Sequence, residues 1–187
     1  MLGSPSSARP DPNTYWVIEG RFLAGEYPGA RDPAEAREKI AAFLEAGITT
    51  FIDLTEPHEL APYEPLLANT GAEYRRFSIR DVSVPRDVRY MLDILDAIDA
   101  ALAAGRNVYL HCWGGIGRTG TVVACWLQRH GRSPDKALLE LARSWQTVAK
   151  RHRRPNTPET DEQVAWVRSW LTMSSTTMKN TGGSSNR

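Results

Sequence analysis

A glycine-rich segment at residues 111–120, His-Cys-Trp-Gly-Gly-Ile-Gly-Arg-Thr-Gly, places the strongest constraint on how this chain can fold. It follows the apolar, strand-like pattern of 107–111 and precedes the helical pattern of 118–130. Glycines allow backbone N–H groups to turn inward around an anion, and the N-terminus of the following helix adds positive potential at the same place. The segment therefore predicts a strand, a phosphate-binding loop and a helix in direct succession.

Strand-like and helix-like patterns alternate along most of the chain, separated by turn residues. The patterns predict strands at 15–18, 21–24, 48–53, 72–79 and 107–111, and helices at 33–46, 63–69, 87–104, 118–130, from Ser133-Pro134 and from Thr157-Pro158. Such alternation is typical of an α/β domain, with a central, mostly parallel sheet of about five strands flanked by helices. Ligands of such sheets bind at the carboxyl ends of strands, and the glycine-rich segment begins at such an end.

Length and composition indicate one ordinary globular domain. The 187 residues fall within the roughly 100–200 typical of a domain, and 41% of them are hydrophobic and 24% charged. Both ends of the chain are poor in apolar residues and therefore cannot form a packed core. We therefore expect a folded unit at 15–172, with disordered tails at 1–14 and 173–187.

Charge and targeting features exclude several kinds of partner. The 23 basic and 22 acidic residues leave a net charge of +1, which gives no reason to expect a nucleic-acid partner. No apolar run approaches the roughly 18 residues of a membrane span, and residues 1–7 lack the apolar stretch of a signal peptide. Two cysteines are too few for a disulfide scaffold. The expectation is a cytoplasmic, monomeric protein with free thiols and without a cofactor, metal, nucleic-acid or membrane partner.

Cys112 and Arg118 add reactive side chains to the predicted phosphate-binding loop. A helix N-terminus and a neighbouring arginine can lower the pKa of a thiol from about 8.5 to roughly 3.5–7.5, so Cys112 is predicted to be a thiolate nucleophile. Arg118 can hold two oxygens of a transferred group at once, which a lysine does less well. Thr119 can donate its hydroxyl to the cysteine sulfur when that sulfur leaves in a second step. A lone cysteine is more often a small core residue, but a core residue needs none of these neighbours.

The other residues of the segment are predicted to bind or support the substrate. His111 ends a buried strand and points away from Cys112, so we expect it to hold loop carbonyls or tune the thiolate rather than transfer a proton. The phosphate-binding residues are expected to be Trp113, Gly114, Gly115, Ile116, Gly117 and Arg118.

Residues 115–120 also match the pattern G-x-G-x-x-G of dinucleotide-binding proteins. That motif requires a second strand directly after the helix, ending in an acidic residue about 20 positions on, whereas Gly131 is followed by another helical pattern. A Walker motif fails because Cys112 replaces its first glycine and Arg118 replaces its lysine. The dinucleotide interpretation is therefore much the weaker one.

Cys112 and Arg118, separated by five residues and followed by Thr119-Gly120, resemble the signature loop of the cysteine-based protein tyrosine phosphatase superfamily. The resemblance covers most of 15–172 and is greatest for the compact dual-specificity-like branch, which includes small bacterial and plant-type tyrosine phosphatases. It implies a phosphomonoester hydrolase that acts on phosphorylated proteins or peptides, or on small phosphoesters, through a cysteinyl-phosphate. Phosphotyrosine is favoured because residues 113–117 carry no positive side chain. A phosphatase of inositol phosphates, phosphoinositides or RNA 5′-phosphates remains the alternative.

The same resemblance implies a general acid on the loop before the long helix, and Asp81 occupies that place. A carboxyl group suits this task because an alkoxide or phenolate leaves poorly without a proton. Asp87 is better explained as the start of the helix, and Asp53 as a brace for a turn. The Trp-Pro that precedes the acid in larger tyrosine-specific members is absent. Residues 157–163 resemble a segment that brings a glutamine near the active site to position water, which assigns that role to Gln163.

Three other features have simpler explanations. Cys125 lies roughly 10 Å along its helix from Cys112, beyond the reach of about 7 Å for a disulfide, so it is expected to pack in the core. The basic run at 150–154 either forms a solvated surface or attracts acidic phosphopeptides or another polyanion. The aspartates at 93, 96 and 99 are spaced as a solvated helix face and not as a metal site.

Overall fold

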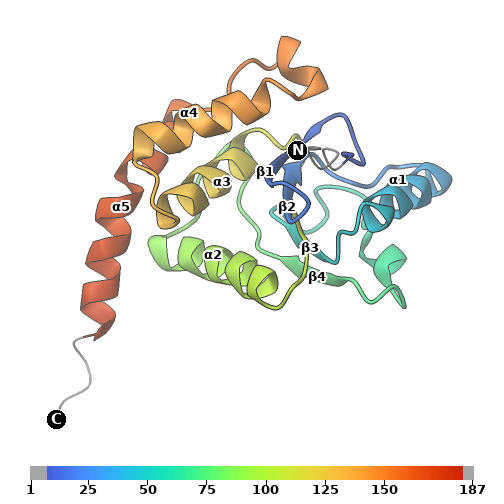
Figure 1. The fold of residues 1–187 in the computed structure, drawn as a ribbon, viewed down its shortest axis with the longest axis horizontal. Coiled ribbons are helices and arrows are strands. Elements are labelled where there is room, and N and C mark those ends of the chain that lie inside the picture. The colour runs from blue at the N-terminus through green and yellow to red at the C-terminus, as the bar shows by residue number, and fades with distance from the viewer. Residues whose placement is uncertain (1–7, 183–187) are drawn as a thin grey trace, which may run out of the picture.

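The computed structural model describes residues 8–182, which include a five-stranded sheet (Figure 1). The strands are β1 (Thr14–Ile18), β2 (Phe22–Gly25), β3 (Thr50–Asp53), β4 (Glu73–Arg76) and β5 (Val108–His111). Their order across the sheet is β1-β2-β5-β3-β4. Only β1 and β2 pair in antiparallel fashion, and the other neighbours are parallel. The predicted class, an α/β domain with a mostly parallel sheet, is confirmed.

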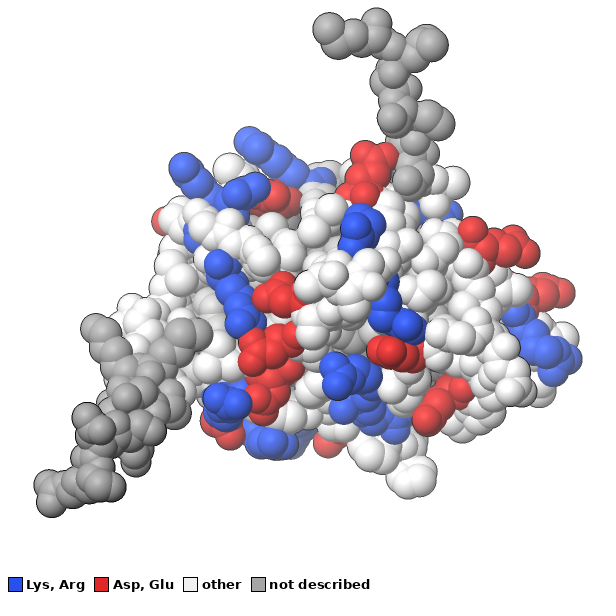
Figure 2. Space-filling model, turned by 60° about the horizontal axis from the view of Figure 1, so that its bottom comes forward, with Lys and Arg blue, Asp and Glu red and all other residues white. Residues whose placement is uncertain are grey.

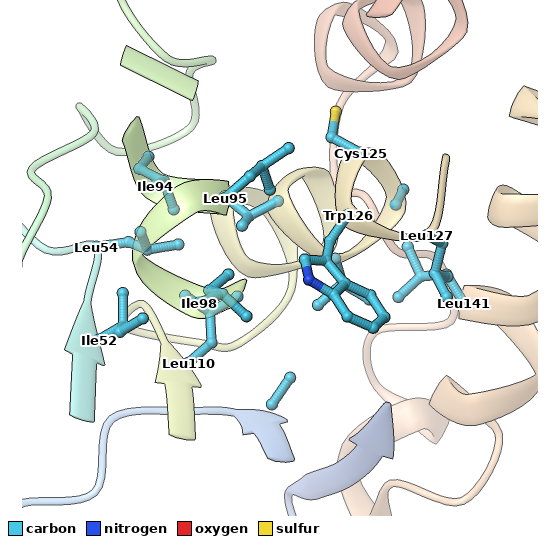
Figure 3. Close-up of a cluster of buried hydrophobic side chains, with 14 of the residues drawn as sticks. Ile52, Leu54, Ile94, Leu95, Ile98, Leu110, Cys125, Trp126, Leu127 and Leu141 are labelled. Carbon is cyan, nitrogen blue, oxygen red and sulfur yellow. The ribbon is translucent and has the colours of Figure 1, made fainter. Parts of the chain in front are cut away.

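Helices cover both faces of this sheet. They are α1 (Pro33–Glu45), α2 (Val88–Ala103), α3 (Gly117–Arg129), α4 (Pro134–Trp145) and α5 (Asp161–Gly182), with short 3₁₀ helices η1 (Glu64–Leu67) and η2 (Ala149–His152). Core residues of α1 and η1 pack on one face of the sheet, and those of α2 to α5 pack on the other (Figure 1). Successive residues of a strand point to opposite faces of the sheet. Tyr109 therefore lies on the face of α1, where it packs on Phe43, whereas Leu110 lies on the face of α2 (Figure 3).

Capping residues begin α1 and α2 at the positions expected from the sequence. Asp32 Oδ1 accepts hydrogen bonds from the N–H groups of Ala34 and Glu35 at 3.0 and 2.9 Å. Asp87 Oδ1 accepts from the N–H of Tyr90 at 2.7 Å. These bonds satisfy amides that have no partner within the first helical turn. Asp87 therefore starts α2, as the sequence indicated.

Two elements are shorter than predicted. The strand expected at 72–79 forms ladder pairs only within β4, although the N–H of Phe77 still donates to Asp53 O at 2.8 Å and that of Ile79 to Leu54 O at 3.0 Å. The helix expected at 63–69 is the single 3₁₀ turn η1. The chain after β4 therefore stays close to the end of β3, which directs it toward the end of β5.

The described structure includes parts of both expected tails, 8–14 and 173–182. Arg9 Nη2 donates to Thr147 O at 3.1 Å, and Thr14 belongs to β1. At the other end α5 continues to Gly182, and Ser175 Oγ donates to Leu171 O within this helix at 2.7 Å. Residues 1–7 and 183–187 lie outside the described residues. Within 8–182, neither α5 nor any other helix has the length and apolarity of a membrane span.

The last helix begins three residues later than predicted, with Asp161 in place of Pro158 as its first residue. Thr160 caps α5, because its Oγ1 accepts from the N–H of Gln163 while Gln163 Oε1 accepts from the N–H of Thr160, both at 3.2 Å. The peptide bond between Thr157 and Pro158 is cis. The Thr157 hydroxyl donates to Ile116 O at 2.8 Å, so it holds the glycine-rich loop instead of capping a helix.

Candidate active site

The glycine-rich loop connects the carboxyl end of β5 to the N-terminus of α3. Cys112 is the first residue after β5 and is only 3% exposed. Gly115 has a φ of 68°, and a Cβ at this position would lie 2.3 Å from the carbonyl carbon of Gly25. Only glycine fits both restrictions. The loop is thereby held against the end of β2, which fixes its path around Cys112.

Three carbonyl groups of this loop are held by the elements around it. They accept hydrogen bonds as follows: Cys112 O from His111 Nδ1 at 3.1 Å, Trp113 O from Tyr27 N at 3.0 Å and Ile116 O from Thr157 Oγ1 at 2.8 Å. In the described part of the chain, the N–H groups of 113–116 make no hydrogen bond to protein. A loop whose carbonyl groups bond to the surrounding elements, and whose N–H groups have no protein partner, can bind an anion at its centre.

Arg118 lies in the first turn of α3 with its side chain only 2% exposed. Its Nη1 and Nη2 donate to the two carboxylate oxygens of Glu59 at 2.8 and 2.6 Å, and Nη1 also donates to Ile79 O at 3.0 Å. Burial alone would lower the pKa of Arg118, but the hydrogen bonds and charge of Glu59 raise it overall. The bidentate pair fixes the plane of a permanent cation, as recognition of a planar or tetrahedral anion requires.

Sequence reasoning missed Glu59. The residue lies in the loop after β3, which is the parallel neighbour of β5 in the sheet. Burial raises the pKa of Glu59, but hydrogen bonds from Arg118 and from the N–H of Glu56 bring it below its usual value, so the side chain is a carboxylate. Its place after a strand that adjoins β5 is the only sequence signal. That signal applies equally to Glu56 and Glu64.

Asp81 reaches the same arginine from the loop between β4 and α2. Its Oδ1 lies 2.8 Å from Nη2 of Arg118, and its side chain is 50% exposed. The next residue, Val82, has a φ of 56°, which a β-branched residue rarely adopts. Gln163 holds this loop, because its Nε2 donates to Ser83 O at 2.9 Å. The predicted acid and the predicted phosphate-binding arginine are thus in direct contact.

Gln163 is buried at the start of α5, between the acid loop and the glycine-rich loop. Its Oε1 accepts from the N–H groups of Glu159 and Thr160 at 3.0 and 3.2 Å. A Cβ on Gly117 would lie 2.7 Å from the amide of Gln163, so the two loops and α5 meet at this side chain. The structure brings Gln163 to the site, while its water-positioning role stays a prediction.

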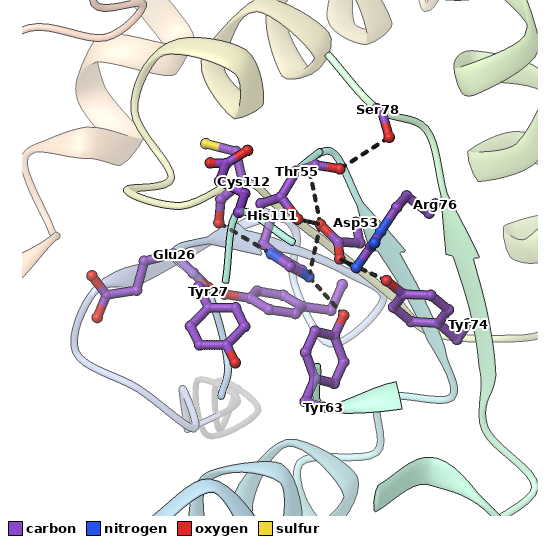
Figure 4. A network of polar contacts seen from close by, with 12 residues as sticks. Glu26, Tyr27, Asp53, Thr55, Tyr63, Tyr74, Arg76, Ser78, His111 and Cys112 are labelled. Carbon is purple, nitrogen blue, oxygen red and sulfur yellow. Dashed lines mark hydrogen bonds and ion pairs between the residues drawn. The ribbon is translucent and has the colours of Figure 1, made fainter. Parts of the chain in front are cut away.

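His111 is completely buried beneath Cys112 in a network of polar contacts (Figure 4). Its Nε2 lies 2.6 Å from the hydroxyl of Tyr63, and its Nδ1 lies 3.1 Å from the carbonyl oxygen of Cys112. Because a carbonyl can only accept, Nδ1 carries the proton and Nε2 accepts from Tyr63. Burial lowers the pKa of His111, which favours this neutral form. His111 therefore holds the first carbonyl of the loop.

Asp53 stands behind His111 at the end of β3, with Oδ1 3.9 Å from Nε2 (Figure 4). Its carboxylate accepts from the N–H and hydroxyl of Thr55 at 2.8 and 2.7 Å, from Tyr74 at 2.7 Å and from Arg76 at 3.0 Å. Burial by itself raises the pKa of Asp53, but the positive charge that His111 carries when protonated and these hydrogen bonds lower it overall. Asp53 braces the turn after β3, as expected, and adds a buried negative charge to the network.

Thr119 and Trp113 complete the site in opposite environments. The hydroxyl of Thr119 is buried and has no hydrogen-bond partner among the residues that the structure describes. Such hydroxyls are rare in proteins, so this one is available to a further hydrogen-bond partner. Trp113, the residue after Cys112 in the chain, is 54% exposed.

The remaining candidates lie away from this site. Cys125 is buried in α3 among core residues, and burial raises the pKa of its thiol, which confirms the expectation of core packing (Figure 3). On α2, Asp96 and Asp99 form ion pairs with Arg129, so this face is more than a solvated row of carboxylates. Figure 2 shows acidic and basic side chains interspersed on the face it presents, without a large area of one sign.

A mostly parallel sheet whose central strand leads into this cysteine- and arginine-bearing loop, with a carboxylate beside it, defines the class of cysteine-based protein tyrosine phosphatases. The model of a family described as "Polymorphic toxin system, DSP-PTPase phosphatase" matches residues 27–132. The chain belongs to this family of DSP-PTPase phosphatases.

Individual relatives agree with this assignment. A protein of Invertebrate iridescent virus 3 named as a tyrosine phosphatase, 067L, is 31% identical over 160 residues, which cover 83% of this chain and 58% of the viral protein. The dual specificity protein phosphatase CDC14A of Mus musculus is 29% identical over 127 residues, covering 63% of this chain and 19% of CDC14A. The crystal structure of Tk-PTP in the active form has a TM-score of 0.68 at 28% identity, covering 86% of this chain and 97% of Tk-PTP. The chain thus spans less than two thirds of the length of the viral protein and of CDC14A.

Proposed function

We propose that this chain is a protein tyrosine phosphatase, with or without activity on phosphoserine and phosphothreonine, that works through a cysteinyl-phosphate. The observation that supports this most directly is the contact of Asp81 with Arg118 at 2.8 Å beside the loop that carries Cys112. Nucleophile, anion-binding cation and acid therefore belong to one site. The reaction needs no cofactor, since these residues supply every group that it requires.

In the first step, the Cys112 thiolate attacks phosphorus and the bond from phosphorus to the ester oxygen breaks. Asp81 donates its proton to that leaving oxygen. The free N–H groups of 113–116 and Arg118 hold the non-bridging oxygens of the phosphoryl group. Because these donors are already in place before the substrate arrives, they stabilise the charge of the transition state without reorganisation.

In the second step, water attacks phosphorus and passes a proton to the Asp81 carboxylate, while the phosphorus–sulfur bond breaks. Thr119 donates its unpartnered hydroxyl to the departing sulfur of Cys112, which stabilises the thiolate. Gln163 adjoins both the acid loop and Gly117 and orients the water. Inorganic phosphate then leaves, and Asp81 has regained its proton.

Phosphotyrosine is the favoured substrate because the rim contains an exposed aromatic side chain, Trp113, and residues 113–117 include no cationic side chain. The phenyl ring of phosphotyrosine can pack on this indole while its phosphate lies in the loop. A phosphatase of inositol phosphates, phosphoinositides or other non-protein phosphoesters is the second candidate. We further propose a cytoplasmic, monomeric enzyme, since both of its cysteines are free thiols, as a reducing compartment would keep them.

The test is hydrolysis of para-nitrophenyl phosphate by the wild type and three variants. Cys112→Ser is expected to abolish turnover, and Asp81→Asn to lower kcat by about 100- to 10,000-fold with a nearly unchanged KM. Cys125→Ser, the matched control on the other cysteine, is expected to retain turnover. Substantial activity in a folded Cys112→Ser variant would contradict the mechanism, and a normal kcat in Asp81→Asn would assign the acid to another residue.

A further inference from the structure

The basic run Lys150-Arg151-His152-Arg153-Arg154 lies beside the glycine-rich loop, although nothing in the proposed reaction uses it. Most of it forms η2 and the residues that follow. We call residues 150–154 the basic arm. Its attachments near the loop, and the lack of carboxylate partners for some of its charged side chains, together indicate what it binds.

The basic arm is attached near the glycine-rich loop through its first residue and through Thr157, three residues after its last. Lys150 Nζ lies 2.6 Å from Glu26 Oε2, and the residue after Glu26, Tyr27, donates its N–H to Trp113 O. The Thr157 hydroxyl donates to Ile116 O at 2.8 Å. The arm therefore cannot move far from the loop while these two attachments persist.

The charges at the centre of the arm are unpaired. Lys150 and Arg154 have carboxylate partners, Glu26 at 2.6 Å and Glu159 at 3.7 Å. Arg151 and Arg153 have no carboxylate within ion-pair distance among residues 8–182, and Arg151 donates only to the carbonyl of Val148 at 3.3 Å. The basic arm thus has two cationic side chains without a carboxylate partner among the described residues, near an anion-binding loop.

We propose that Arg151 and Arg153 bind acidic residues that flank the phosphotyrosine of a peptide substrate. The proposal rests on the proposed function and names the substrate class of the same site. Arginine suits this task because its planar guanidinium matches the geometry of a carboxylate. The two side chains act on substrate selection and take no part in the phosphoryl transfer.

Chain geometry places these cations within reach of a bound peptide. Arg153 is three residues from Lys150 and four from Thr157, so its Cα lies at most about 14 Å from either attachment. A 3₁₀ turn rises only about 2 Å per residue, which shortens the first of these spans further. In an extended peptide, residues two to four positions from the phosphotyrosine lie about 7–13 Å away. The two ranges overlap.

An acidic peptide fits this rim better than an anionic membrane does. The neighbouring loops expose Glu56 and Asp81, which a flat anionic surface would have to approach together with the arm. The net charge of +1 also gives the whole molecule little attraction to a lipid surface.

The experiment compares two phosphotyrosine peptides of one length, which carry either Asp and Glu or Asn and Gln around the phosphotyrosine. The wild type is expected to prefer the acidic peptide by about 3- to 10-fold in kcat/KM, and salt is expected to reduce the preference. Arg151→Gln/Arg153→Gln should lose the preference. The control Arg37→Gln/Arg75→Gln removes two exposed arginines of α1 and β4 and should keep it.

Each other outcome has a distinct meaning. Equal rates on both peptides in the wild type, or an undiminished preference in Arg151→Gln/Arg153→Gln, would overturn the role of the arm. The variant could also lose activity on vesicles containing a phosphatidylinositol phosphate but keep it on the acidic peptide. That result would overturn the proposal of a peptide substrate in favour of a lipid substrate. A wild type that fails to hydrolyse para-nitrophenyl phosphate would instead refute the proposed function on which the inference depends.

Discussion

Replacing Glu59 with glutamine separates the positioning of Arg118 from the reaction itself. Glu59 accepts two hydrogen bonds from Arg118 at 2.8 and 2.6 Å, and its side chain is 11% exposed. Glutamine has nearly the same size but no charge, and its NH₂ group faces a guanidinium nitrogen that can only donate. The change therefore leaves a buried cation with one acceptor fewer and without its main counter-charge.

The expected loss follows from the number and burial of these contacts. A hydrogen bond to a charged group contributes about 1.5–3 kcal/mol, and breaking a buried ion pair costs about 3–5 kcal/mol. Because glutamine keeps one acceptor and Ile79 O and Asp81 still contact Arg118, we expect a loss of about 2–3 kcal/mol in the free energy of unfolding. For a domain of this size, Tm falls by about 2–4 °C for each kcal/mol. The variant should therefore melt about 4–12 °C lower.

The difference in Tm between the wild type and Glu59→Gln should depend on pH. Although burial raises the pKa of Glu59, the bonds from Arg118 lower it overall below its usual 4.5. A folded-state pKa below the unfolded one means that Glu59 stabilises the protein above pH 4.5, and that this stabilisation is lost as the pH falls through the folded value. The gap in Tm should thus be full at pH 7 and should narrow below pH 4.5.

The assay combines thermal melts with steady-state hydrolysis of para-nitrophenyl phosphate. With Arg118 misaligned, kcat/KM should fall by about 10- to 100-fold, since each tenfold corresponds to about 1.4 kcal/mol of transition-state stabilisation. Glu56→Gln is the matched control, because Glu56 is exposed and contributes its backbone N–H, not its carboxylate, to Glu59. Unchanged Tm and kcat/KM in Glu59→Gln would refute the argument that this pair positions the arginine.

Three further predictions follow from single contacts. Arg118→Lys should lower kcat/KM by at least about 100-fold in the same assay, because an ammonium cannot bond both oxygens of Glu59 and a phosphate. Tyr63→Phe should lower the free energy of unfolding by about 1–3 kcal/mol in urea titrations, because it leaves the buried Nε2 of His111 without a donor. Burial lowers the pKa of His111 below its usual 6.5, so the unfolded chain takes up the proton first and the Tm of the wild type should fall as pH drops below 6.5. A flat Tm between pH 7.5 and 5.5 would contradict this ionisation.

The sequence was sufficient for the parts of the molecule that depend on local patterns. The capping residues Asp32 and Asp87 and the apolar strand before Cys112 each specify their own element through bonds to near neighbours. The glycine-rich loop is also local, because Gly115 needs a positive φ wherever the rest of the chain lies. These elements could be predicted because their constraints act within a few residues.

The unpredicted features depend on contacts between distant segments. Glu59 is one of several acidic residues in its loop, and only its distance to Arg118, 59 positions away, distinguishes it. Thr157 has the sequence of a helix cap, but its hydroxyl bonds to Ile116 O across 41 positions. The last turns of α5 have a polar sequence without an apolar face, so the pattern does not predict that the helix continues there, with Ser175 bonded to Leu171 O.

The contacts of Arg118 connect substrate entry with proton donation. Its guanidinium already faces two carboxylates, Glu59 and Asp81. A phosphate monoester adds a charge of about −1.5 to −2 at pH 7, which repels both carboxylates. Glu59 is held in place, because it is nearly buried and also accepts the N–H of Glu56. Asp81 is half exposed on a loop, so it is the carboxylate that we expect to leave Arg118. It then lies beside the entering phosphate, where the proposed reaction requires a proton donor.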